Sequence, residues 1–80
     1  MKWTIREDEI VVLFYLKFKE DWYSHFDELE RDFTKEGFVL RKKDSLKMRV
    51  QNVQYIDTEK GLANYARQTK EVYDRLTKGY

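Results

Sequence analysis

Apolar residues recur along the chain at the three- and four-residue intervals of amphipathic helices, in four segments separated by short polar stretches. The first segment opens at Thr4, and Glu7 follows three residues later in the pattern of a capping box. Apolar side chains nearly encircle the segment that runs on to Phe18, which predicts a central, largely buried helix. The β-branched and aromatic residues of this segment leave a strand as the alternative.

The second segment is expected to begin after Ser24, whose hydroxyl can cap a helix, and to end at Gly37 as a C′ residue. One face of it is apolar and packs inward, while its acidic residues stay in solvent; the apolar residues are Phe26, Leu29 and Phe33. Residues 38–40 follow as an extended connector or a small strand.

The third segment is expected to be capped by Asp44 or Ser45. Its inward side is formed by Leu46, Val50 and Val53, with Met48 at the border of that side. A turn over residues 57–60, closed by Gly61, leads to a fourth helix at about residues 62–77. The inward residues of this last helix are expected to be Tyr65, Val72, Tyr73 and Leu76.

These segments predict a mainly α fold, a small four-helix domain over residues 1–80 with room for one short strand pair. The second and third helices, joined by a connector, have the outline of a helix-turn-helix unit. The connector is longer than a tight turn, which favours a winged-helix-like variant.

Composition narrows the chemistry that the chain can perform. It has no cysteine, which excludes disulfides and thiolate metal sites, and its single histidine, His25, cannot build a zinc site alone. Thirteen aromatic residues supply the mass of the core. The longest apolar run, residues 10–16, is too short to span a membrane and follows acidic residues instead of a basic leader, so we expect a cytoplasmic protein without membrane contact.

Charge is unevenly distributed although the formal net charge is only +1. Residues 20–36 carry seven acidic and two basic side chains, whereas residues 41–60 carry six basic and three acidic ones. The densest basic stretch is residues 41–52, and we predict that it contacts nucleic acid through Arg41, Lys42, Lys43, Ser45, Lys47, Arg49, Gln51 and Asn52.

The residue types of this stretch suit a DNA partner, duplex DNA in particular. Lys42 and Lys43 precede a helix whose N-terminal amides also attract phosphate, and the amides of Gln51 and Asn52 are of the type that pairs with adenine. The alternative is a solvated basic loop in which Asn52 satisfies local backbone groups.

The stretch also carries a resemblance. Arg41, Ser45-Leu46, Arg49-Val50 and Asn52-Val53, followed by Gly61-Leu62, Asn64 and Val72-Tyr73, resemble the N-terminal domain of HNH-type restriction endonucleases. The resemblance implies a helical, winged-helix-like module that docks DNA, sometimes sensing modified bases. By position it would place Arg41, Ser45, Arg49 and Asn52 in the recognition segment, with Gly61, Leu62 and Asn64 shaping the turn. The chain departs from the family in lacking the nuclease half and in carrying Val53 where an aromatic residue is usual.

No catalytic constellation is evident, and we expect neither an enzyme nor a cofactor. Acidic pairs such as Glu7/Asp8 are interpreted as solvent-exposed helix faces, and no phosphate-binding glycine loop exists.

A second hypothesis is a protein-binding regulator, carried by a phage or mobile element, that inhibits a bacterial defence nuclease such as a CRISPR or restriction effector. Its contact surface would be formed by Trp22, Tyr23, Asp27, Glu28, Glu30 and Asp32. Trp22 can instead pack into the core. A homodimer is compatible with either hypothesis.

Overall fold

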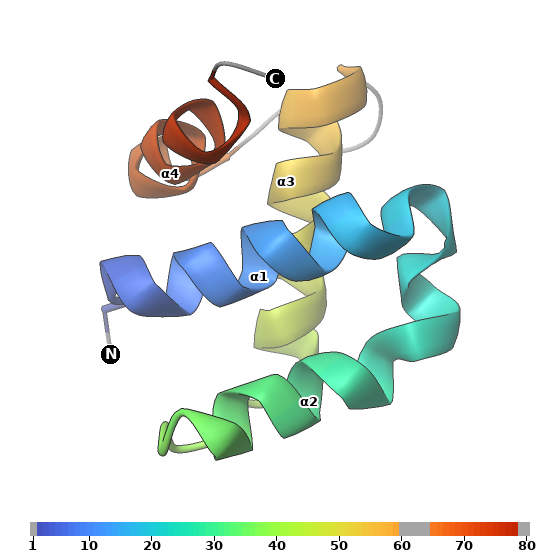
Figure 1. Ribbon diagram of the computed structural model, residues 1–80, viewed down its shortest axis with the longest axis vertical. Helices are drawn as coiled ribbons and strands as arrows, with labels where there is room; N and C mark the ends of the chain where they lie inside the picture. The colour runs from blue at the N-terminus through green and yellow to red at the C-terminus, as the bar shows by residue number, and fades with distance from the viewer. Residues whose placement is uncertain (1, 60–64, 79–80) are drawn as a thin grey trace.

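The described chain is helical, and no β-strand occurs in residues 2–59 or 65–78 of the computed structural model, which are the residues whose structure is described (Figure 1). Its elements in chain order are α1 (Ile5–Phe18), the 3₁₀ helix η1 (Lys19–His25), α2 (Phe26–Lys35), α3 (Lys43–Thr58) and α4 (Arg67–Thr77). The mainly α prediction is confirmed. Residues 38–40 form a connector without strand structure.

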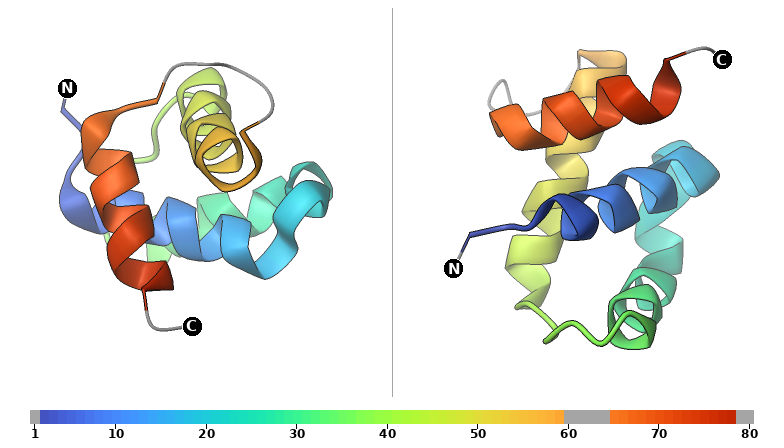
Figure 2. Two further views of the ribbon diagram at one scale, coloured as in Figure 1. Left: turned by 90° about the horizontal axis from the view of Figure 1, so that it is seen from above. Right: turned by 60° about the vertical axis from the view of Figure 1, so that its left-hand side comes forward.

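Helix α1 occupies the centre of the molecule. It lies between α4 and α2, and α3 crosses it on one side (Figures 1 and 2). The core gathers around α1 because that helix contributes apolar side chains toward several neighbours; the buried apolar residues are Ile10, Val11, Val12, Phe14, Tyr15, Trp22, Leu29, Phe33, Leu46, Val50, Val53 and Val72. The predicted central helix is therefore confirmed, although Ile5 and Leu13 on its outer side are exposed.

The start of α1 follows the local sequence signal. The Thr4 hydroxyl accepts a hydrogen bond from the Glu7 amide at 3.1 Å, and the Thr4 amide donates to the Glu7 carboxylate at 2.9 Å. This is the predicted capping box, which satisfies two backbone donors at the helix start.

The start of α2 differs from the prediction. Ser24 lies inside η1, and α2 begins at Phe26 after His25, whose side chain makes no capping hydrogen bond. The 3₁₀ turns carry Trp22 into the core, where its indole nitrogen donates to the Gln54 side-chain oxygen at 3.0 Å. Packing of Trp22 thus decides the local backbone, and the helix starts later.

The end of α2 is a Schellman motif. Gly37 has φ +80°, the Phe38 amide donates to the Phe33 carbonyl at 3.1 Å, and the Gly37 amide donates to the Thr34 carbonyl at 3.0 Å. The rings of Phe33 and Phe38 are in contact, which is the apolar contact typical of this motif. The prediction of Gly37 as a C′ residue is confirmed.

Helix α3 is longer than predicted at both ends. It begins after Lys42 without a side-chain cap, so Asp44 and Ser45 lie in its first turn and the predicted cap is wrong. The predicted turn at residues 57–60 is wrong for Asp57 and Thr58, which are helical, and the helix ends at Glu59 in a left-handed conformation.

The chain between α3 and α4 is only partly described. Gly61, Leu62 and Asn64 lie outside the described residues. Helix α4 begins at Arg67, later than predicted, and Tyr65 precedes it with 43% of its surface exposed, so its predicted place in the core is wrong.

Candidate nucleic-acid interface

Helix α3 presents one apolar side and one open side. Leu46, Val50 and Val53 are fully buried, as predicted from their spacing. Ser45, Met48 and Gln51 are exposed, and their helical spacing places them on the opposite side of α3. The predicted basic helix therefore offers a polar surface to a partner, with Met48 at its centre.

Arg49 does not lie on this open side. Its guanidinium donates to both carboxylate oxygens of Asp8 at 2.8 Å and lies 4.6 Å from the centre of the Trp3 ring. Asp8 is fully buried and also accepts hydrogen bonds from Gln68 at 2.7 Å and Thr69 at 3.1 Å. These four hydrogen bonds, from three residues, stabilise the ionised carboxylate, so Arg49 functions as an internal counter-ion.

Arg41 is bound in the same way. It donates to the two oxygens of Glu7 at 2.7 and 3.0 Å and to the Lys2 carbonyl at 2.8 Å, and it lies 4.2 Å from the centre of the Trp3 ring. The hydrogen bond to Glu7 raises the pKa of Arg41 and, despite partial burial of the carboxyl, lowers the pKa of Glu7.

These residues form one unit, which we call the Trp3 cluster: Trp3, Glu7, Asp8, Arg41, Arg49, Gln68 and Thr69. It joins the N-terminal segment to α1, α3 and α4 through polar bonds around one indole ring. Only 14% of each arginine side chain is exposed, so both arginines predicted to contact DNA are largely enclosed by the protein.

Asn52 is also bound within the chain. Its amide nitrogen donates to the Met48 carbonyl at 2.7 Å, and its oxygen accepts from the Ala66 amide at 2.8 Å. The side chain thereby fixes the backbone just before α4 against α3. The amide group expected to pair with a base is occupied, whereas Gln51 makes no side-chain hydrogen bond to the described residues.

The three lysines of the predicted site have no acidic partner among the described residues. Lys42 and Lys43 are exposed and form no ion pair with the described part of the chain. They lie beside the first-turn amides of α3, because the first helical hydrogen bond runs from the Leu46 amide to the Lys42 carbonyl. Lys47 donates to the Tyr23 hydroxyl at 3.3 Å, a neutral partner that leaves the ammonium charge uncompensated.

The structure also changes which residues could form the contact surface of the protein-binding hypothesis. Trp22 is buried, so the expectation that it could be exposed at a contact surface is wrong, whereas Tyr23 is exposed. Asp27 pairs with Arg31, and Glu28 pairs with Lys17, each at 3.3 Å. The remaining acids, Glu30 and Asp32, have no ion pair within residues 2–59 and 65–78.

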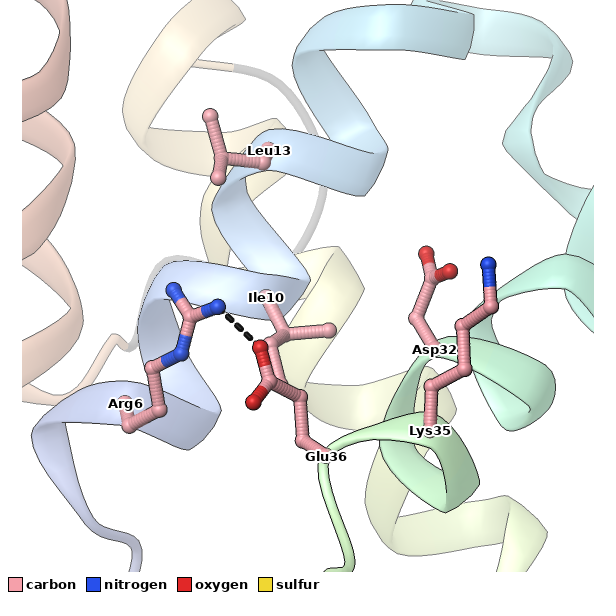
Figure 3. A pocket seen from close by; sticks show the side chains of 6 residues that line it. All are labelled: Arg6, Ile10, Leu13, Asp32, Lys35 and Glu36. Carbon is pink, nitrogen blue, oxygen red and sulfur yellow. Dashed lines mark hydrogen bonds and ion pairs between the residues drawn. The ribbon is translucent and has the colours of Figure 1, made fainter.

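A pocket of about 210 Å³ adjoins Asp32 between α1 and α2 (Figure 3). Arg6 and Glu36 form an ion pair across it, and Leu13 lines one end. The lining residues are Arg6, Ile10, Leu13, Asp32, Lys35 and Glu36. Acidic, basic and apolar groups are mixed in this pocket, and its charges largely compensate one another.

The sequence interpretation did not identify the acidic half of the Trp3 cluster. Glu7 and Asp8 were expected to be solvated, yet both are buried. A signal was present, because Asp8, Val11, Val12 and Tyr15 share one helix face at the spacing i, i+3, i+4 and i+7. An acid within an apolar stripe requires a buried basic or hydrogen-bonding partner.

A further, half-buried carboxylate supports the opposite end of α3. Asp57 accepts hydrogen bonds from the hydroxyls of Tyr15 at 3.0 Å and Tyr73 at 2.5 Å. Burial raises the pKa of Asp57, but the two hydroxyls together with the nearby Lys19 ammonium outweigh it, and the pKa is lowered. Burial, followed by the bond to Asp57, raises the pKa of Tyr73 to about 12. The group is structural, since it connects α1, α3 and α4.

Among the described residues no cluster of three or more potential metal ligands occurs, and no helix has the length and apolar character needed to cross a membrane. Comparisons of the chain with protein-family models, with curated proteins and with solved structures gave no match.

Proposed function

We propose that the chain is a non-enzymatic DNA-binding module. Lys42, Lys43 and Lys47 contact phosphates, and the open side of α3 faces the base edges. The observation that carries the proposal is the row of lysines without acidic partners at the start of a helix whose outer side is exposed.

The chemistry of this surface fits a duplex. Lysine ammonium groups and first-turn amides both attract phosphate, and the major groove of DNA is wide enough to admit one α-helix. Ser45 and Gln51 then stand where side-chain hydroxyl and amide groups can read base edges. Arg41, Arg49 and Asn52 act indirectly, because they hold α3 at its angle to α1 and α4.

The resemblance to the N-terminal domain of HNH-type restriction endonucleases belongs to the same proposal. Arg41, Arg49 and Asn52, which carry much of that resemblance, are bound inside this protein. Their shared pattern therefore supports a common fold more strongly than a common DNA contact.

The salt dependence of DNA binding tests the proposal. Three neutralised phosphates predict a log–log slope of about −2.7 for duplex DNA, since each phosphate contributes about −0.9. Fluorescence anisotropy with a labelled duplex should give this slope. Lys42→Glu/Lys43→Glu should abolish measurable binding, whereas Lys35→Glu/Lys78→Glu should change it much less, although the change in net charge is equal. Equal losses in the two double variants would indicate a nonspecific charge effect and contradict the proposal.

A second candidate function is inhibition of a bacterial defence nuclease through the acidic surface of α2. Glu30 and Asp32, which lack ion pairs in the described chain, favour it because they can meet a basic nucleic-acid channel. A DNA-cleavage assay with a CRISPR or restriction effector should then slow when the protein is added. Glu30→Lys/Asp32→Lys should relieve that inhibition, and Lys42→Glu/Lys43→Glu should not; any other pattern argues against this function.

A further inference from the structure

Two tyrosines extend the open side of α3 at its C-terminal half. Tyr55 follows Met48 and Gln51 at helical spacing, so it lies on the same side of the helix. Its ring stacks on that of Tyr65, with centroids 5.8 Å apart and an interplanar angle of 29°. Tyr65 is 43% exposed, which leaves part of the ring pair open to solvent.

A pocket of about 180 Å³ adjoins the two rings. Its other lining residues are Ile56, Glu59 and Lys70. The Lys70 ammonium is held by Asp74 at 2.7 and 3.0 Å, and Glu59 is an exposed carboxylate, so the described residues that line the pocket offer no free cation to a phosphate. Its groups suit a flat, uncharged ring instead, because Glu59 can accept a hydrogen bond from an exocyclic amino group.

We propose that the Tyr55–Tyr65 pair stacks against an unpaired DNA base, which makes a duplex with a single-stranded extension the preferred partner. Aromatic rings that stack on bases are the general means by which proteins hold unpaired nucleotides. This inference rests on the proposed DNA-binding function, because the lysines at the start of α3 must hold the adjoining phosphates.

The length of α3 sets the size of the extension. Lys43 and Tyr55 are twelve residues apart, which corresponds to about 18 Å along a helix. A stacked strand rises about 3.4 Å per nucleotide along its axis, so the two contacts are separated by about five nucleotides. An extension of at most five or six nucleotides should therefore reach the tyrosines, and fewer are needed where the duplex itself continues along α3 past Lys43.

The inference is tested by anisotropy with labelled duplexes that are blunt, carry a six-nucleotide cytosine extension at the 5′ or 3′ end, or carry an abasic extension of equal length. One cytosine extension should bind about 5- to 150-fold more tightly than the blunt duplex, the range expected for one base–aromatic stack. The abasic extension should lose this preference. Tyr65→Leu should lose it too, while Tyr65→Phe, which keeps the ring, should retain it.

The inference and the proposed function fail in different ways. Equal affinity for blunt, cytosine-extended and abasic duplexes, or an unchanged preference in a folded Tyr65→Leu variant, overturns the stacking site. Binding of the blunt duplex that still depends on Lys42 and Lys43 would then preserve the proposed function. Absence of binding to every probe overturns both.

Discussion

Replacing Asp8 by alanine would leave the Arg49 guanidinium in the Trp3 cluster without its carboxylate. The same change removes the acceptor used by Gln68 and Thr69. Because Asp8 is fully buried and Arg49 is 14% exposed, water cannot fully replace the lost carboxylate. The perturbation therefore tests whether the cluster holds the fold.

The expected magnitude follows from this burial. Breaking a buried ion pair by removing one partner costs about 3–5 kcal/mol. An 80-residue domain has a free energy of unfolding of about 4–12 kcal/mol. The substitution should thus remove a large fraction of the stability and lower the melting temperature by more than about 12 °C, at about 4–8 °C per kcal/mol.

Urea denaturation followed by circular dichroism measures this loss. The matched control is Asp27→Ala, which breaks an exposed pair with Arg31 and should cost less than about 0.5 kcal/mol. The double variant Asp8→Asn/Arg49→Met retains an acceptor for Gln68 and Thr69 without a stranded charge, so it should be more stable than Asp8→Ala. A loss below about 1 kcal/mol for Asp8→Ala would refute the reasoning.

Three further predictions concern single groups. The pKa of Tyr73 is raised to about 12, so its contribution to the free energy of unfolding is complete below pH 10 and is lost as pH rises toward 12. Urea titrations at several pH values should show that Tyr73→Phe loses less stability between pH 10 and pH 12 than the unsubstituted protein. Glu7 has a lowered pKa, so its contribution is present above its usual value of 4.5 and is lost as pH falls below that value; Glu7→Gln should be less stable at neutral pH and less sensitive to acid. Gly37→Ala should lower the free energy of unfolding by about 1–2 kcal/mol at φ +80°, and Gly37→Asn should cost less; equal stability of all three proteins would contradict the Schellman account.

Local signals in the sequence predict the parts of the fold that depend on neighbouring residues. The Thr4–Glu7 capping box and the glycine that ends α2 each involve residues within a few positions, and both were predicted correctly. The start of α2 and the end of α3 were not. Trp22 and Asp57 determine those boundaries through partners 32 and 42 residues away, at Gln54 and Tyr15.

The residues of the candidate site also divide into those that local sequence predicts and those that depend on distant partners. Burial of Leu46 follows from helical spacing, whereas Lys42 and Lys43 are exposed because they stand at the very start of α3. The sequence could not separate these lysines from Arg41 and Arg49, because charge patterning does not reveal which cations meet acids 34 and 41 residues away. Tertiary pairing places two of the five basic side chains of residues 41–52 inside the structure.

Chemical-shift mapping tests the central claim most directly. A ¹⁵N-labelled sample titrated with a short DNA duplex should show its largest amide shifts at Lys42, at Lys43 and at the exposed residues of α3 up to Gln51. Glu30 and Asp32 on α2 should stay unchanged, and the Arg49 side-chain resonance should move little, since its donors remain on Asp8. Shifts centred on α2, or a titration without shifts at Lys42 and Lys43, would contradict the account.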